Sequence, residues 1–411
     1  MHKIKLHGSH PDLKTNSKYL VGCFIRPDQK IGLIIIDKDD NSFEHSINCN
    51  CDTQFNRPQI AIADNNILYL TFSNSDGNEI KFLVITIYSV DRIDIKDLTF
   101  QLEQKHHCST PKIAVINGIA CIVWHEWYKE NGKELHALKM YYNGKQYFIE
   151  KFSEKEYRDH NIVAITYGEP KYFAIYYKSA GDFGYIKGFK INDLFFFNIP
   201  KIAKPEANGT VSMGDTVIFK NDSKCNPYHA FFFYTSNVGG YMYLDTGEDQ
   251  IRISDYLEHE IPSKNYNIEP NPRIFVDANE EIFIVFPFEM GKKMAYVKYN
   301  KGEFTEDSFP SKFESKSYAA ITGFNNQVIV MYEYDRKQLV LKAIDECKTY
   351  EIVEDGDNQE NNVNTNEGDG NDNTNNISNK KQDKKYNNII EKYIDLWASK
   401  AGRWLEKKLK F

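Results

Sequence analysis

Two short segments of the chain place a carboxylate beside large aromatic residues. The segments are WHEW and YEYD, and their candidate residues are Trp124, Glu126, Trp127, Tyr332, Glu333 and Tyr334. An aromatic ring offers apolar contact, and an adjoining carboxylate accepts hydrogen bonds. Glu289 has a comparable place near the end of another apolar run. These seven residues are the candidate ligand-binding residues, although an exposed rim of such side chains would equally suit a protein partner.

The aromatic residues belong to a repeat. Near the end of a short apolar run an aromatic residue returns every 45–57 residues, with Pro287 in one irregular place, at Phe24, Phe72, Trp124, Tyr177, Tyr234 and Tyr332. A four-stranded propeller blade needs roughly 40–50 residues, which matches this period. Aromatic residues at strand ends usually fill the gap between stacked sheets. This column of recurring aromatic residues therefore predicts the propeller architecture more strongly than it predicts a ligand-binding site.

Each repeat contains four strand-like runs in a constant order. A small run that ends in turn formers, such as RPQIAIADN (57–65) or NPRIFVDAN (271–279), precedes the aromatic run. A third apolar run and a polar fourth run follow, as expected for an exposed edge strand. We expect HKIKLHGS to supply the inner strand of the first repeat and KTYEIVE (348–354) the outer strand of the last. The fifth repeat is irregular, and its inner strand lies somewhere in GTVSMGDTVIFKND.

These patterns predict an all-β fold, a seven-bladed propeller over residues 1–353. Residues 354–384 are acidic and Asn-rich, which predicts a disordered linker. Residues 385–411 show helical spacing of apolar groups, which predicts an amphipathic helix. This helix could dock on the propeller, bind a partner or lie on a membrane surface. Its candidate contact residues are Tyr393, Trp397, Trp404 and Leu405.

Composition excludes several classes of protein. A net charge of -7 gives no general attraction to nucleic acid. No apolar stretch reaches 18 residues, so we expect no membrane span. The first residues lack an apolar signal core, and the seven cysteines are thinly spread. Both observations favour a cytoplasmic protein with reduced thiols.

Soft metal ligands gather in HSINCNC (45–51) and KHHCST (105–110). Both segments precede an inner strand, so they could meet on one face of the ring, but Cys-x-Cys lacks the usual spacing of a zinc finger. We therefore expect no metal and no cofactor. Phosphate-binding loops and Ser-His-Asp signatures are also lacking in the sequence.

The repeat resembles that of fucose-binding lectins and, through them, the sialidase-like propellers. The shared pattern is Pro-x-Ile-Ala-Val, an Asn-Gly turn, an apolar strand that ends in an aromatic residue, and a polar turn before the next strand, over about residues 17–353. The resemblance implies sugar pockets between adjacent blades, each with an aromatic platform, an Arg and a Glu. Only Arg57 and Arg273 share a position in the repeat, so one or two degenerate pockets are expected.

The favoured function is a non-catalytic recognition module that binds a glycan or a protein. The enzyme alternative is a sialidase-like glycoside hydrolase, for which the resemblance implies an arginine cluster, a Tyr-Glu nucleophile pair and an Asp acid. CFIRPDQ carries Arg26 and Ile25 in the reverse of the order that the family's motif requires. A further alternative is an adaptor recruited through the C-terminal helix to a partner or membrane.

Overall fold

The structure is a computed structural model that describes residues 3–344 with breaks, the longest at 51–56, 164–171, 180–184, 191–195, 200–209, 257–271 and 311–317. Judged by the contacts between its residues, the chain divides into two compact units, Met1–Tyr350 and Glu351–Phe411. The predicted linker and C-terminal helix, including Tyr393, Trp397, Trp404 and Leu405, lie outside the described residues and stay predictions. No helix in the described part of the chain has the length and apolar character to cross a membrane.

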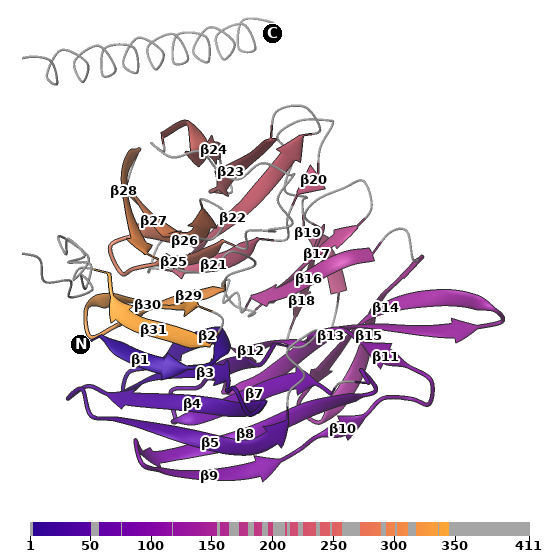
Figure 1. Ribbon diagram of the computed structural model, residues 1–411. Helices are drawn as coiled ribbons and strands as arrows, with labels where there is room; N and C mark the ends of the chain where they lie inside the picture. The colour runs from indigo at the N-terminus through magenta and orange to yellow at the C-terminus, as the bar shows by residue number, and fades with distance from the viewer. Residues whose placement is uncertain are drawn as a thin grey trace, which may run out of the picture. The chain divides into compact units, whose positions relative to one another are not determined.

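The described strands form seven sheets, numbered here in chain order (Figure 1). Sheet 1 contains β2 (Ser9–Thr15), β3 (Tyr19–Ile25), β4 (Lys30–Asp37) and β5 (Ser42–Asn50). Sheet 2 contains β6 (Gln59–Ile62), β7 (Ile67–Ser73), β8 (Glu79–Ser89), β9 (Arg92–Asp97) and β10 (Phe100–Gln101). Sheet 3 contains β11 (His107–Cys108), β12 (Lys112–Ile116), β13 (Ile119–Glu130), β14 (Lys133–Tyr142) and β15 (Lys145–Ser153).

The later sheets follow the same plan. Sheet 4 contains β16 (Tyr157–Val163), β17 (Tyr172–Ser179), β18 (Tyr185–Lys190) and β19 (Phe196–Ile199). Sheet 5 contains β20 (Thr210–Val211), β21 (Asp215–Lys220), β22 (Cys225–Thr235), β23 (Gly239–Asp245) and β24 (Gln250–Arg252), followed by the 3-10 helix η1 (Ile253–Tyr256). Sheet 6 contains β25 (Arg273–Val276), β26 (Ile282–Phe288), β27 (Lys293–Asn300) and β28 (Glu303–Pro310). Sheet 7 contains β1 (Ile4–His7), β29 (Ala319–Phe324), β30 (Gln327–Asp335) and β31 (Gln338–Ala343).

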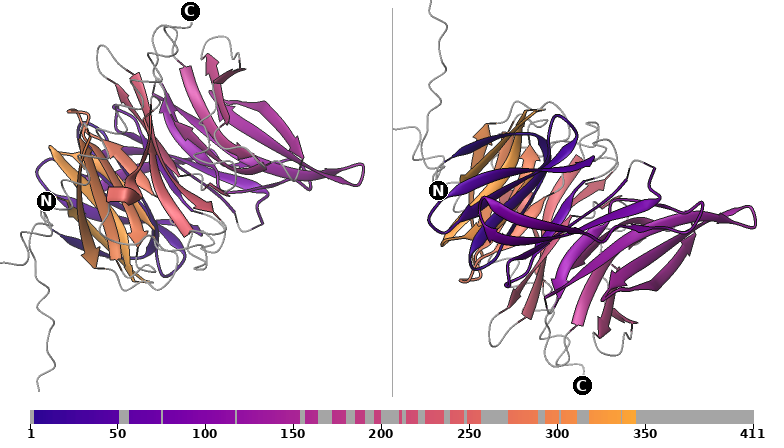
Figure 2. Two further views of the ribbon diagram at one scale, coloured as in Figure 1. Left: turned by 90° about the horizontal axis from the view of Figure 1, so that it is seen from above. Right: turned by 90° about the horizontal axis from the view of Figure 1, so that it is seen from below.

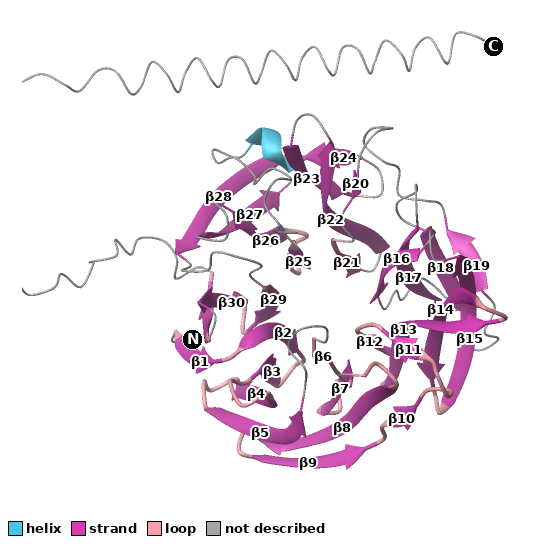
Figure 3. Cartoon of the chain, turned by 45° about the vertical axis from the view of Figure 1, so that its right-hand side comes forward, coloured by secondary structure: helices cyan, strands magenta, loops and turns pink. Residues whose placement is uncertain are grey.

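The innermost strands of the sheets contact one another in a closed series. The series is β2, β6, β12, β16, β21, β25, β29 and again β2 (Figure 3). All strand pairs within the sheets are antiparallel. This arrangement confirms the predicted all-β propeller with four-stranded blades. The inner strand of the irregular fifth repeat is β21, which the sequence left without a boundary.

The hydrophobic core lies between the faces of neighbouring sheets. Phe24 packs with residues of sheet 7, Phe72 with sheet 1, Trp124 with sheet 2 and Tyr332 with sheet 6. Each of these rings thus fills the gap toward the preceding sheet, and all four are buried. For these four residues, the expectation that the recurring aromatic side chains fill the gaps between sheets is confirmed.

Strands β13 and β14 form a hairpin that extends beyond the neighbouring sheets, as both views of Figure 2 show at the right. Asn131 and Gly132 make its turn, both with positive φ. Asn and Gly tolerate this left-handed backbone conformation, which a two-residue hairpin turn of this twist requires. The hairpin is the longest in the described residues, and its tip is exposed.

The strand that closes the ring corrects the prediction for the first repeat. Ile4–His7 does not begin sheet 1 but pairs with β31 as the outer strand of sheet 7, with Leu6 opposite Leu339. Ser9–Thr15 is the inner strand of sheet 1 instead. The place predicted for 348–354 at the edge of sheet 7 is therefore taken by β1, and residues 348–354 lie outside the described residues. Pairing across the two ends of the propeller gives β31 the partner that its outer edge requires.

This closure predicts that Leu6 carries much of the stability that β1 contributes. Leu6 is buried against the cluster shared by sheets 7 and 1, whereas the neighbouring Lys5 is exposed. We expect Leu6→Ala to lower the free energy of unfolding by about 2–5 kcal/mol, because it leaves a cavity in the closing contact. The control Lys5→Ala should change it by less than about 0.5 kcal/mol. Urea unfolding measures both, and equal effects of the two substitutions would contradict the role of Leu6.

Candidate functional site

Most of the candidate residues from WHEW and YEYD are buried in the core. Trp124 and Glu126 are 0% and 1% exposed, and Tyr332 and Glu333 are 2% and 1% exposed. None of the four presents a surface to a ligand from solvent. Glu289 lies outside the described residues.

Glu126 joins several side chains inside sheet 3. Its carboxylate accepts hydrogen bonds from Trp124 Nε1 at 2.9 Å and from Lys139 Nζ at 2.6 Å, and it contacts His106 Nδ1. Burial acts to raise the pKa of Glu126, but the hydrogen bonds from Lys139, His106 and Trp124 lower it below its ordinary value. Glu126 is therefore ionised, and its carboxylate is engaged in hydrogen bonds within the protein.

Trp127 and Tyr334 are half-buried. The Trp127 ring lies beside the rings of His107 and His125, with centroids 5.9 and 5.3 Å away. Tyr334 packs against the cluster between sheets 6 and 7. These two are the candidates of the aromatic-carboxylate segments that keep an exposed surface.

The metal-ligand segments do not assemble in the described residues. His45 contacts the carbonyl oxygen of Val90 through Nε2 at 2.7 Å, while His106 contacts Glu126. No group of three or more potential ligands is found in the part of the chain that the structure describes. Cys51 lies outside that part.

Glu333 organises a polar cluster at the beginning of three inner strands. Its carboxylate accepts the backbone N–H of His10 at 2.7 Å and that of Tyr318 at 3.1 Å. The Tyr318 ring contacts the His10 ring, with centroids 4.5 Å apart, and the Arg57 guanidinium, with Cζ 3.8 Å from the ring centroid. The lectin resemblance implies an aromatic residue, an Arg and a Glu, and all three types are present here. The half-buried Tyr318 ring is in contact with both His10 and Arg57 within the protein.

The ionisable groups of this cluster have displaced pKa values. Burial raises the pKa of Glu333 to about 7, against the opposing effects of the two N–H groups and Arg57. Burial, and next the charge of Arg57, lowers the pKa of His10 to about 4. At neutral pH His10 is therefore uncharged, and Glu333 is poised between its two forms.

Carboxylates from one sheet also hold the inner strand of the next. Asp12 of β2 accepts the N–H of Ile60 in β6 at 2.9 Å, and Asp215 of β21 accepts that of Ile274 in β25 at 3.3 Å. Both isoleucines follow a Pro-x dipeptide. An inner strand has one edge without a partner strand, and a buried N–H there must find another acceptor. The sequence analysis did not identify these two aspartates. The pattern that could have identified them is an acidic residue on one inner strand, followed in the next repeat by an inner strand that begins with Pro-x-Ile.

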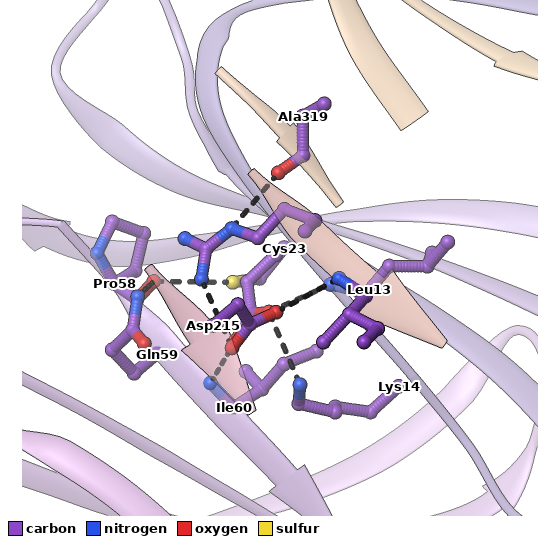
Figure 4. Close-up of polar contacts among 11 residues, drawn as sticks. Leu13, Lys14, Cys23, Pro58, Gln59, Ile60, Asp215 and Ala319 are labelled. Carbon is purple, nitrogen blue, oxygen red and sulfur yellow. Dashed lines mark hydrogen bonds and ion pairs between the residues drawn. The ribbon is translucent and has the colours of Figure 1, made fainter. Parts of the chain in front are cut away.

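Charged side chains line the narrow channel between the inner strands. Figure 4 shows a dashed line from each of Lys14 and Ile60; Lys14 Nζ lies 3.5 Å from Asp12 Oδ1, and the N–H of Ile60 donates to Asp12 Oδ2. Arg273 donates through Nε to the carbonyl oxygen of Ala319 at 3.2 Å and lies 3.8 Å from Asp215. The channel cavity measures about 340 Å³. Lys14 and Arg273 thus lie close to the two carboxylates of the channel, and Lys112 adds a third basic side chain to its lining.

A larger recess adjoins the channel at the far ends of the inner strands. It measures about 710 Å³ and lies between sheets 1, 6 and 7. Thr15 and Phe275 line both cavities, so the recess continues the channel. A volume of this size suits a small ligand, since such sites commonly enclose about 300–1,000 Å³.

The lining of the recess combines one half-buried ring with many amides. Phe275 supplies the ring. Asn325 and Asn326 form the turn between β29 and β30 with positive φ values of 51° and 59°. The amide-bearing residues of the lining are Asn16, Asn279, Asn325, Asn326 and Gln327. The sequence analysis did not identify Asn325 and Asn326 as part of a site.

The comparisons with known proteins bear on the fold. No family model matches the chain, and no curated protein matches it. An ulvan lyase of polysaccharide lyase family PL25, bound to -[GlcA(1-4)Rha3S]-, is 10% identical, with coverage of 83% of this chain and 96% of its own, at a TM-score of 0.51. At such identity the likeness shows the fold alone.

The two groups named by the sequence resemblance are also among the similar structures. Aleuria aurantia lectin in complex with alpha-methyl-L-fucoside is 11% identical, covering 75% of this chain and 95% of its own, at a TM-score of 0.44. Trypanosoma rangeli sialidase in complex with the inhibitor DANA is 9% identical, covering 75% of this chain and 57% of its own, at a TM-score of 0.42. The chain is thus similar to propellers of the lectin and sialidase groups.

The raised pKa of Glu333 predicts a pH-dependent stability. Because its pKa lies above the ordinary value of 4.5, the folded protein binds more protons than the unfolded chain between pH 4.5 and 7. The contribution of Glu333 to stability should be full below pH 4.5 and fall as pH rises to 7, by at most about 3 kcal/mol.

The comparison with Glu333→Gln isolates this effect, because the lowered pKa of His10 acts in the opposite direction in an overlapping range. The difference in unfolding free energy between the wild type and Glu333→Gln should fall as pH rises from 4.5 to 7, because the contribution of His10 is common to both proteins. The exposed Glu303→Gln serves as control, and its difference from the wild type should not follow this trend. An identical pH profile for wild type and Glu333→Gln would contradict the raised pKa.

The contact between sheets 1 and 2 predicts a cost for Asp12→Ala. This substitution leaves the buried N–H of Ile60 without its carboxylate, so we expect the free energy of unfolding to fall by about 1–3 kcal/mol. Hydrogen exchange at residues 57–63 should accelerate as well. The exposed Asp94→Ala should change neither quantity. Unchanged exchange in Asp12→Ala would show that water or another group replaces the carboxylate.

Proposed function

We propose that the chain is a seven-bladed propeller that acts as a glycan-recognition module, with its sugar site in the recess between sheets 1, 6 and 7. The seven sheets and the closed series of inner strands support the blade number. The observation that carries the function is the composition of the recess, a half-buried aromatic ring among amide side chains in a volume of about 710 Å³.

The chemistry of these groups matches that of a sugar. A sugar ring has C–H groups that can pack on an aromatic face, and Phe275 supplies that face. Its hydroxyls both donate and accept hydrogen bonds, as does the side-chain amide of Asn326, whereas Asn325 Nδ2 already donates to the carbonyl oxygen of Lys38 at 3.0 Å, so its amide oxygen is the group that could accept from a sugar. Two left-handed turn residues hold these amides in place, which reduces the entropy cost of binding.

The charge of the recess favours an uncharged sugar. Asp277 lines the recess, but its Oδ1 already accepts the N–H groups of Asn279 and Glu281. Lys38 is the basic residue of the lining, and it lies in the acidic segment Asp37–Asp40. A binding site for an acidic sugar would need an excess of positive charge that this lining lacks.

The lining also favours recognition over hydrolysis. Asp277 is the single carboxylate among the described residues that line the recess. Glycoside hydrolysis ordinarily uses two carboxyl groups at a fixed separation. We therefore prefer a non-catalytic role to the sialidase-like alternative.

A glycan array followed by titration tests the proposal on the full chain. We expect binding of a neutral glycan, and Phe275→Leu should weaken it about tenfold, because the flat ring is worth about 1.4 kcal/mol. Asn326→Gly removes an amide but keeps the left-handed turn, and it should weaken binding about two- to tenfold. Asn143→Gly, in the left-handed turn between β14 and β15, is the matched control and should bind normally.

Different outcomes would contradict the location of the sugar site and the glycan-binding function. Binding that survives both Phe275→Leu and Asn326→Gly would place the sugar elsewhere. Failure of the folded wild type to bind any glycan on the array would overturn the glycan-binding function itself.

A further inference from the structure

The tip of the Phe275 ring occupies the space that a side chain at position 323 would need. A Cβ atom built on Gly323 would lie 2.4 Å from Phe275 Cζ and 3.1 and 3.2 Å from its Cε atoms. Carbon atoms in contact are ordinarily about 3.5–4.0 Å apart. The ring of β25 in sheet 6 therefore reaches across to β29 of sheet 7 only because residue 323 has no side chain.

The backbone gives no other reason for a glycine at this position. Gly323 lies in β29 opposite Val328, and its φ is not in the left-handed region. Glycine weakens a strand, because it loses more conformational entropy on folding and has no side chain to pack. Its presence here is explained by the space it leaves.

Four other inner strands carry larger residues at the comparable place. Gly323 stands one residue before the last pair of its hairpin, Phe324 with Gln327. The corresponding residues of sheets 1, 2, 3 and 6, judged from their last hairpin pairs, are Thr15, Ile62, Val115 and Val276. All four are β-branched, as strand positions favour. Sheet 7 thus has a glycine where these four sheets have a β-branched residue, and this is the position that lies against Phe275.

We propose that Gly323 is a positioning residue that fixes the orientation of Phe275 and thereby decides which sugars the recess accepts. This inference rests on the proposed glycan-binding function. Both residues line the recess, and Phe275 also lines the channel. A side chain at position 323 displaces the ring tip, which changes the platform and the passage between the two cavities.

A double-mutant cycle tests this coupling. Gly323→Ala should weaken binding of the array-selected neutral glycan about tenfold in the wild-type background. In the Phe275→Leu background, whose shorter side chain leaves room for the added methyl group, Gly323→Ala should change affinity less than twofold. Equal losses in both backgrounds would overturn the proposal.

Gly32→Ala provides a matched control for a clash of the same kind. A Cβ on Gly32 would lie 2.5 Å from Phe24 Cε2 and Cζ, in the core between sheets 1 and 7 and not in the recess lining. In the folded fraction of that variant, glycan affinity should equal that of the wild type. An equal loss of affinity in Gly32→Ala would assign the Gly323 effect to general destabilisation and overturn the proposal.

A spectroscopic measurement separates this inference from the function on which it rests. With 3-fluorophenylalanine incorporated, the fluorine resonance assigned to Phe275 should shift in Gly323→Ala and stay in place in Gly32→Ala. An unmoved resonance would overturn the positioning role even where sugar binding changes. A shifted resonance in a protein that binds no array glycan would leave the positioning intact and overturn the glycan site.

Discussion

The open edge of each inner strand is the constraint on which the rest of the propeller depends. An inner strand has a partner strand on one side only, so alternate N–H groups point toward the next sheet. Asp12 and Asp215 accept such groups from Ile60 and Ile274. Glu333 accepts the N–H of His10 in the same manner, from sheet 7 to sheet 1. These bonds fix neighbouring sheets against each other at their inner strands, where apolar packing alone would allow sliding.

The geometry of the recess depends on these hydrogen bonds at the inner strands. Its residues come from three sheets, whose inner strands β2, β25 and β29 are held at or just before their beginnings by the carboxylates of Glu333 and Asp215. Phe275 and the Asn325–Asn326 turn approach each other only when sheets 6 and 7 are fixed in register. The polar clusters at one end of the inner strands thus support the cavity at the other.

Local patterns in the sequence predicted much of the fold. The aromatic column identified the second strands, because a large ring recurs near the end of that strand in six of the seven repeats. Residues 4–7 were misplaced, because their alternating pattern fits an inner or an outer strand equally, and only the distant β31 decides between them. A short strand that pairs across the whole length of a domain leaves no local signal.

The candidate site was harder to predict, because adjacency along a strand says little about exposure. Trp124 and Glu126 are two residues apart and so share one face, which is buried against sheet 2, whereas Trp127 belongs to the other face. The charged neighbour that suggested a ligand site is a hydrogen-bond acceptor for Trp124 itself. The recess residues are separated by up to about 300 positions in the chain, and no motif joins them.

The closing strand has a consequence for the order in which the protein is made. Residues 4–7 are synthesised long before their partner β31, which ends at Ala343. The nascent chain therefore carries Ile4–His7, with its apolar Leu6, without a partner strand through the synthesis of nearly the whole propeller, and sheets 7 and 1 can pack together fully only after β31 has left the ribosome. Contacts of such sequence separation slow folding and prolong exposure to aggregation. The same pairing that covers the outer edge of β31 in the folded ring thus makes completion of the ring depend on a strand that is synthesised more than 300 residues after its partner.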